Sequence, residues 1–409
     1  MNQVDDPGMG DPTTGRARKS PWQRAFGGGA AAASLLAVAP ATLLLIVAET
    51  RQGRLVGGVA ACGALTLVCL VAMAWRWPTP PRPWAIGAGV WLAAGATLAV
   101  ALAWSSPGDS PERSIGLISR AFGDRRVPRL SPAKLLPEID QVKLGVTLAT
   151  RFVPWMGRAR TIREVTMGLY RAIEANPDAR GLGPVTHYGG LEAIGLDFRA
   201  DHYFAYVPEP KPGERLGAVV FLHGNGGNFQ VMPWACRELA ESRRVIILCP
   251  TFGFGFWGEG GVEAVDRAWL DALGRWPIDP ARVDLAGLSD GGLGVTRSAL
   301  AHPDRYRGLI YVSPTMRRDE LGSLPFEMGW KGRPILVLQG DRDWSVAKST
   351  VDPAVDLLRR LGCDVDYRVF PGEDHFLFFS RRLELSDAIG GWMARAEDAR
   401  SSGEKAGER

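Results

Sequence analysis

The chain has 409 residues and a formal net charge of +4, with 48 Lys and Arg against 44 Asp and Glu. This length predicts more than one folded region. The small net charge, without a basic stripe interleaved with aromatic residues, excludes nucleic acid as an expected partner. None of the five cysteines forms a C-x-x-C pair, so we expect no zinc or redox-disulfide site.

The first 104 residues predict a tail followed by a membrane region. Residues 1–24 are rich in Gly, Pro, Asp and Arg and contain few apolar side chains, which predicts a disordered tail. Residues 25–104 then hold three uncharged apolar runs, each long enough to cross a bilayer as a helix. The runs are Ala25 to Ala48, Leu55 to Trp75 and Trp84 to Trp104. We therefore expect three transmembrane helices in contact with membrane lipids.

Two other interpretations of the apolar runs are weaker. The first run resembles a signal peptide, because Ala37-Val-Ala39 is similar to a cleavage site. That site lies inside the apolar run, however, and two further runs follow it. A soluble helix bundle requires a polar face on its helices, and no polar face interrupts these runs.

The basic residues around the runs predict their orientation. Four precede the first run, and two more fall on the same side if all three runs cross: Arg16, Arg18, Lys19, Arg24, Arg76 and Arg82. The opposite side carries Arg51, Arg54, Arg113 and Arg120. Because positive charge favours the cytoplasm, this bias predicts a cytoplasmic tail, a multi-pass cell-membrane protein and an extracytoplasmic C-terminal domain.

The remaining chain divides into a connecting region and a domain. Residues 105–184 contain many prolines and two helical patterns, Glu138 to Thr150 and Thr161 to Ala175, which we expect to pack on the domain that follows. Residues 185–396 alternate short apolar runs with helical patterns. That alternation predicts an α/β fold with a doubly wound, mostly parallel sheet. Residues 397–409 predict a disordered tail.

The ranges expected in this domain are as follows. The strands are Tyr203 to Val207, Gly217 to Leu222, Arg244 to Cys249, Arg282 to Ala286, Gly308 to Val312, Pro334 to Leu338 and Val365 to Phe370. The helices between them are Val231 to Glu241, Val262 to Trp276, Gly292 to Ala301 and Val351 to Leu361.

One turn carries the strongest chemical signal. The segment Gly287-Leu-Ser289-Asp-Gly291 follows a predicted strand and precedes a predicted helix. This G-x-S-x-G pattern is typical of a sharp turn that presents a nucleophilic serine above a parallel sheet. The helix N-terminus behind Ser289 adds positive potential where an oxyanion develops.

A nucleophilic serine requires a base and a carboxylate that orients the base. Among five histidines, His375 lies in a Pro-Gly loop directly after the last predicted strand, so it is the candidate base. Two carboxylates follow the strand that ends at Leu338. Asp343 lies farther into this loop and is the preferred acid, whereas Asp341 is expected to shape the turn.

An oxyanion hole requires two backbone N–H groups aimed at one point. Asp290, the residue after Ser289, is expected to supply one of them. The second is expected from the loop His223-Gly-Asn-Gly-Gly227, with the N–H of Asn225 preferred over that of Gly224. His223 itself is expected to brace this loop rather than act as a base.

These four motifs occur in the order HGNGG, GLSDGG, GDRD and the His375 loop, each after a predicted strand. In this order the chain resembles the α/β-hydrolase superfamily over about residues 185–395. The connection that ends before Pro334 is too short for a large lid, so the resemblance is to members of the dienelactone-hydrolase and carboxylesterase type. The aromatic segment Phe252 to Trp257 is expected either to line an acyl pocket or to pack in the core.

The resemblance implies a serine hydrolase in which Ser289 attacks, His375 transfers the proton and Asp343 orients the imidazole. We expect it to cleave a small-molecule or lipid ester, or a thioester, through an acyl-enzyme, with no metal and no organic cofactor. A serine peptidase of the same fold and a non-catalytic binding protein that kept the fold are the alternatives. The sequence leaves the substrate and the oligomeric state open.

Overall fold

The computed structural model describes residues 38–76, 82–105, 114–123, 136–152, 159–176, 201–253 and 255–407. Two compact units form: Met1–Ile46 with Arg54–Trp104, and Val47–Gly53 with Ser105–Arg409. The second is called the catalytic-site unit below, because it contains every residue of the candidate site. The predicted tail at 1–24 and the boundary predicted near residue 184 lie outside the described residues.

In the first unit, two helices are long and apolar enough to cross a membrane. They are α2 (Arg51–Arg76) and α3 (Arg82–Ser105), and most of their apolar windows are not buried within the protein. The first predicted span is described only as the ten-residue apolar helix Val38–Val47, and the start of that run lies outside the described residues. Length and composition thus support two of the three predicted spans.

The catalytic-site unit is built on one sheet of eight strands, in the order β1-β2-β4-β3-β5-β6-β7-β8. Strand β2 pairs antiparallel with β1 and β4, and all other neighbours are parallel. The strands are β1 (Gly116–Ala121), β2 (His202–Val207), β3 (Leu216–Leu222), β4 (Val245–Pro250), β5 (Ile278–Leu288), β6 (Gly308–Val312), β7 (Pro334–Gly340) and β8 (Asp364–Phe370). The mixed sheet confirms the predicted α/β class.

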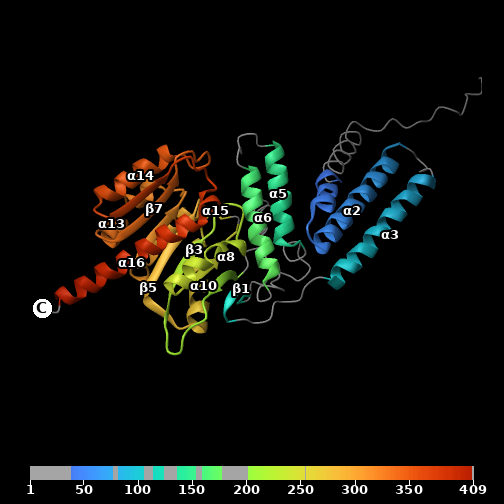
Figure 1. Cartoon of the computed structure of the whole chain (residues 1–409). Coiled ribbons are helices and arrows are strands. Elements are labelled where there is room, and N and C mark those ends of the chain that lie inside the picture. Colours follow the sequence, from blue (N-terminus) through green and yellow to red (C-terminus); the bar gives the residue numbers. More distant parts are fainter. Residues whose placement is uncertain are drawn as a thin grey trace, which may run out of the picture. The chain divides into compact units, whose positions relative to one another are not determined.

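Helices cover both faces of the sheet (Figure 1). Residues alternate between the faces along each strand, so Leu285 joins one apolar core and Ala286 the other. The first core contains α10 (Gly261–Arg275), α11 (Gly291–Ala301), α13 (Leu324–Trp330) and α14 (Lys348–Arg360). The second contains α5 (Glu138–Phe152), α6 (Ala159–Ala175), α8 (Val231–Ala235), α9 (Arg237–Arg243), α15 (Leu377–Ser380) and α16 (Arg382–Gly407). The short elements η1 (Pro303–Arg305) and α12 (Arg318–Leu321) complete the unit.

The segment predicted as a connecting region contributes directly to this unit. Strand β1 is the edge strand of the sheet and pairs with β2. It was not predicted, because its apolar pattern consists of only one pair, Leu117 and Ile118. The two side chains point to opposite faces and are almost completely buried. The sheet therefore begins well before the domain boundary expected near residue 185.

Two helices also differ from the sequence prediction. The single helix expected over Val231 to Glu241 is two helices, because Cys236 leaves helical geometry (φ −95°, ψ 7°). Helix α16 continues to Gly407, where a disordered tail was expected from Glu397. The Glu397 carboxylate accepts a hydrogen bond from Arg307 (2.9 Å) and pairs with Arg243, so the helix is tied to the unit at that residue.

A buried carboxyl joins the α5–α6 pair to the loop after β3. Glu138, at the start of α5, is only 1% exposed. It accepts hydrogen bonds from the Gln230 N–H (3.0 Å) and from the Tyr170 hydroxyl (3.0 Å). Burial raises the pKa of Glu138 to about 8, although both hydrogen bonds oppose that rise. Glu138 is therefore protonated at neutral pH.

We expect the stability of the protein to depend on pH because Glu138 keeps its proton in the folded state. An unfolded chain releases it near the ordinary pKa of 4.5, whereas the folded chain keeps it to about pH 8. The contribution of Glu138 is therefore present at low pH and is lost as the pH rises between these values. In heat denaturation of the full-length protein, the Tm of wild type relative to Glu138→Gln should fall by several degrees from about pH 5 to about pH 8.

The exposed Glu259 supplies the matched control. Glu259→Gln should keep the same Tm difference from wild type at both pH values. Equal pH dependence of wild type and Glu138→Gln would show that Glu138 has no raised pKa.

Candidate active site

The candidate site lies where four parallel strands end. Strands β3, β5, β7 and β8 run in the same direction, so the loops after them meet at one edge of the sheet. Ser289 follows β5, Asp343 follows β7 and His375 follows β8. Ligand sites of open α/β sheets form at this edge.

The Ser289 turn has the strained geometry of a nucleophile elbow. Ser289 has a φ of 54°, which non-glycine residues rarely adopt, and its N–H donates to the carbonyl oxygen of Val312 at 3.0 Å. The turn also passes very close to β3. A Cβ on Gly291 would lie 2.2 Å from the carbonyl oxygen of Leu222, so only glycine fits there. The absence of a side chain at Gly291 thus allows the elbow to form.

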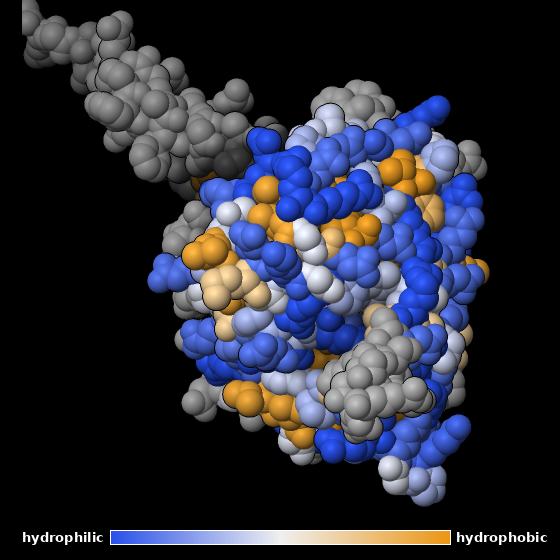
Figure 2. Space-filling view, turned by 90° about the vertical axis from the view of Figure 1, so that its left-hand side faces the viewer, coloured by the Kyte–Doolittle hydropathy of each residue, from blue (hydrophilic) through white to orange (hydrophobic). Residues whose placement is uncertain are grey.

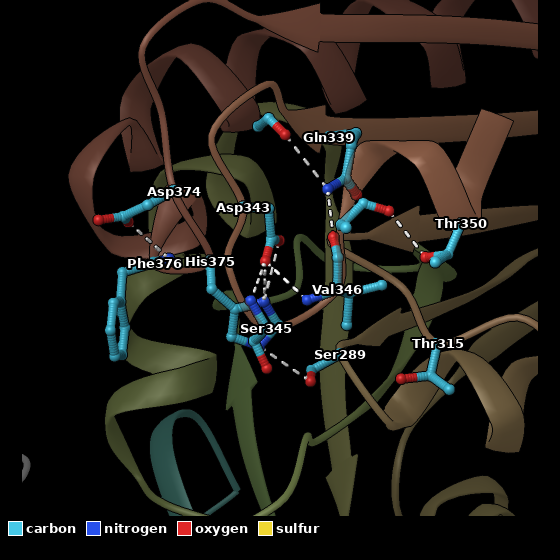
Figure 3. Close-up of polar contacts among 12 residues, drawn as sticks. Ser289, Thr315, Gln339, Asp343, Ser345, Val346, Thr350, Asp374, His375 and Phe376 are labelled. Atoms are coloured by element: carbon cyan, nitrogen blue, oxygen red, sulfur yellow. Dashed lines mark hydrogen bonds and ion pairs between the residues drawn. The ribbon is translucent and has the colours of Figure 1, made fainter. Parts of the chain in front are cut away.

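His375 lies between Ser289 and Asp343 (Figure 3). Its Nδ1 is 2.9 Å and 3.0 Å from the two carboxylate oxygens of Asp343, and its Nε2 is 3.0 Å from the Ser289 hydroxyl oxygen. A carboxylate only accepts hydrogen bonds, so Nδ1 carries the proton. Nε2 is then left to accept the hydroxyl proton of Ser289, which is the geometry that a general base requires.

The surroundings of Asp343 keep it ionised. Burial by itself raises the pKa of this carboxyl, but hydrogen bonds from His375 and from two backbone N–H groups outweigh burial and lower it below its ordinary value. These N–H groups belong to Val346 (2.8 Å) and Ser345 (3.0 Å). Asp341 instead accepts the N–H of Gly372 at 2.6 Å, which joins the acid loop to the histidine loop.

Two of the residues proposed for the oxyanion hole, Gly224 and Asp290, lie next to Ser289. A Cβ on Gly224 would lie 3.0 Å from the Cβ of Ser289, so the loop after β3 passes in contact with the serine. Among the described residues, no acceptor in the protein receives the N–H of Asn225 or of Asp290. Both N–H groups are thus available as donors, as an oxyanion hole requires.

His223 holds this loop rather than facing Ser289. Its Nδ1 lies 2.8 Å from the carbonyl oxygen of Gly224, and its Nε2 accepts the N–H of Phe252 at 3.1 Å. Trp257 donates its indole N–H to the carbonyl oxygen of His223 at 2.8 Å and stacks on Phe252. Phe252 and Trp257 therefore pack in the core, while Phe256 is exposed and Phe254 lies outside the described residues.

Three polar residues that sequence reasoning missed support the site. Gln339 is fully buried and donates to the carbonyl oxygen of Val346 at 2.9 Å, which fixes the acid loop. Thr315 donates its hydroxyl to the Asp290 carboxylate at 2.7 Å, and Glu373 accepts from Arg381 at 2.8 Å beside the histidine loop. Of the three, only Gln339 could have been identified from the sequence, because it is a polar residue at the end of an apolar strand.

The other described histidines have partners away from the serine. His302 pairs with Asp266 at 2.9 Å on the far end of α11, and the buried His202 lies between Ser119 and Thr251. His187 lies outside the described residues. The described ranges hold no group of His, Cys, Asp and Glu side chains that would bind a metal ion, and all five cysteines are free thiols.

No family model matches the chain, and no curated protein matches it. Solved structures that are similar to it include a thermostable esterase, the esterase Est1E from Butyrivibrio proteoclasticus and the fluorophosphonate-binding serine hydrolase FphF from Staphylococcus aureus. Their identities are 21%, 18% and 14%, with TM-scores of 0.36, 0.38 and 0.40. The matches cover 48%, 50% and 47% of this chain, and 56%, 97% and 92% of those proteins.

Because these TM-scores are low, we assign the fold from the sheet and the site. The α/β-hydrolase arrangement has a serine at a strand–turn–helix elbow, with an acid and a histidine later in the chain. It also has a loop after an earlier strand that supplies a backbone N–H to the oxyanion hole. This chain has the serine after β5, the acid after β7, the histidine after β8 and a glycine-rich loop after β3. The mixed sheet with helices on both faces, together with this order of elements, matches the α/β-hydrolase fold expected from the sequence.

The two aspartates of the acid loop differ in a way that mutation can test. Asp343→Asn replaces one acceptor oxygen by an NH₂ group facing the Nδ1 proton, so we expect Ser289 to react with a fluorophosphonate about 10³–10⁴-fold more slowly. Asp341→Asn keeps an oxygen for the Gly372 N–H, so its rate should change less than about tenfold. The measurement is the labelling rate of each full-length variant. The reverse ranking would move the acid from Asp343 to Asp341.

Proposed function

We propose that this protein is a membrane-anchored serine hydrolase that cleaves carboxylic esters or thioesters. The observation that carries the proposal is the position of His375, with Nε2 at 3.0 Å from the Ser289 oxygen and Nδ1 at 2.9 Å from Asp343. Three side chains separated by up to 86 positions meet there in the order that nucleophilic catalysis requires.

The reaction follows from this geometry. As the Ser289 oxygen bonds to the acyl carbon, its proton passes to Nε2 of His375, and Asp343 stabilises the imidazolium that forms. The N–H groups of Asn225 and Asp290 stabilise the negative oxygen of the tetrahedral intermediate. His375 then returns the proton to the leaving alcohol or thiol, which leaves an acyl-serine. Water attacks that ester by the same proton transfer, releases the acid and restores Ser289.

The connection between β6 and β7 is short, and we take this as support for a small ester as substrate rather than a polypeptide. It contains only the helices α12 and α13, of four and seven residues. No large lid is therefore inserted there, and His375 keeps 14% of its side chain exposed. A site of this kind admits a small or lipid-derived ester from solvent or from a bilayer surface.

The full-length protein in detergent micelles should hydrolyse p-nitrophenyl esters in preference to aminoacyl p-nitroanilides. Ser289→Ala should lower kcat/KM by at least about 10³-fold, because it removes the nucleophile. Fluorophosphonate labelling of wild type but not of Ser289→Ala confirms which serine reacts. Preference for the aminoacyl substrates would indicate a peptidase, and absence of both turnover and labelling would indicate a non-catalytic binding protein.

Membrane anchoring is supported by α2 and α3, which carry many exposed apolar side chains. The exposed ones include Leu67, Leu70, Ile86, Val90, Leu92 and Val100. The face of the catalytic-site unit in Figure 2 is instead mostly hydrophilic, with apolar residues in separate areas. Exposed apolar helices of this length are typical of bilayer-spanning segments.

The loop before α2 is held within the catalytic-site unit. Asp140 on α5 accepts the backbone N–H groups of Glu49 (2.6 Å) and Thr50 (3.3 Å), together with the Thr50 hydroxyl. Glu49 in turn pairs with Lys143 at 2.6 Å, and this contact lowers the pKa of the Glu49 carboxyl. This contact supports a topology in which the two ends of the α2–α3 pair lie on the same side of the membrane, so that both helices cross it.

Reporter fusions test this topology. A phosphatase that is active only outside the cytoplasm should be active after Arg409 and inactive after Pro80, between α2 and α3. A reporter that is active only in the cytoplasm should give the opposite pattern. If the phosphatase were active at both positions or inactive at both, α2 and α3 would not each cross the membrane. If it were active after Pro80 and inactive after Arg409, the catalytic-site unit would lie in the cytoplasm.

A further inference from the structure

An exposed tryptophan lies beside the candidate base. Trp344 directly follows Asp343 and keeps 41% of its surface exposed. Its ring centroid is 5.9 Å from that of His375 and 6.1 Å from that of Phe376, which is half-buried. Two aromatic rings, on the loops that carry the acid and the base, therefore lie beside the imidazole and next to each other.

Neither the position nor the hydrogen bonding of the acid loop requires this indole. The loop is fixed by the hydrogen bonds that Asp343 accepts from Ser345 and Val346, and by the one that Gln339 donates to the carbonyl oxygen of Val346. Among the described residues, no protein acceptor receives the Trp344 N–H, although the buried Trp257 and Trp330 both donate theirs. Trp344 thus presents an apolar ring and an available donor to solvent, the combination that suits ligand contact.

The proposed reaction decides which part of a substrate this ring faces. The oxyanion donors of Asn225 and Asp290 hold the carbonyl oxygen, while Nε2 of His375 must reach the leaving-group oxygen to protonate it. The leaving group therefore lies within hydrogen-bond reach of the imidazole. An aromatic ring centred 5.9 Å from the imidazole is in range of groups attached to that oxygen.

We propose that Trp344, together with Phe376, forms the binding surface for the alcohol portion of the ester and selects aromatic or other flat apolar alcohols. This inference rests on the proposed hydrolase function and adds its leaving-group specificity. A stacked or edge-to-face aromatic contact contributes about 0.5–1.5 kcal/mol, which corresponds to about 2–10-fold in kcat/KM.

Three esters separate the alcohol side from the acyl side. Benzyl acetate and ethyl acetate share the acyl group, whereas ethyl acetate and ethyl phenylacetate share the alcohol. In full-length Trp344→Ala, the ratio of kcat/KM for benzyl acetate to that for ethyl acetate should fall about 2–10-fold relative to wild type. The ratio for ethyl phenylacetate to ethyl acetate should stay unchanged. Trp344→Phe, which keeps an aromatic ring, should recover most of the benzyl preference.

The ratios distinguish specificity from a general effect on His375. An equal loss for all three esters would show that Trp344 only positions the imidazole, and would overturn the proposal. A change confined to ethyl phenylacetate, or unchanged ratios, would overturn it as well. In each of these cases wild-type ester hydrolysis still supports the hydrolase function. If wild type hydrolyses none of the esters and Ser289 takes no fluorophosphonate, both proposals fail.

Discussion

The candidate site depends on how closely the elbow after β5 approaches the end of β3. At Gly291 a Cβ would overlap the carbonyl oxygen of Leu222. This close approach brings the Ser289 turn against the β3 loop, where a Cβ on Gly224 would lie 3.0 Å from the Cβ of Ser289. A larger residue at Gly291 would push the two loops apart. The loop after β3 would then no longer lie beside the Ser289 side chain, however well His375 and Asp343 were placed.

The sequence predicted the members of the site because parallel strands simplify the problem. Each apolar run between helical patterns ends at the same edge of the sheet, so a polar residue just after a run has few places to lie. Ser289, Asp343 and His375 all follow such runs, and the structure brings them into contact. Thr315 gave no signal, since a hydroxyl that donates to the Asp290 side chain depends on a fold contact 25 positions away.

The edge strand β1 was not predicted, for a related reason. Strand β1 contributes only two strongly buried apolar residues and lies among prolines, so it has too little periodicity to detect. Helices α5 and α6 were expected, but their amphipathic pattern does not reveal that Glu138 reaches the segment after the β3 loop. A buried carboxyl in a charged stretch is recognised only when its partners are known. The same limit applies to α16, whose polar composition resembles a solvated tail.

Within the catalytic-site unit, Asp140 on α5 holds Glu49 and Thr50, from which the chain runs directly into α2. The other covalent connection to the α2–α3 pair is the chain between α3 and β1. If α2 and α3 span a membrane as proposed, a protease that cuts that chain would not release the catalytic-site unit at once. Release would also require the Val47–Gly53 loop to separate from α5, and salt or acid that weakens the Glu49–Lys143 pair would speed that separation.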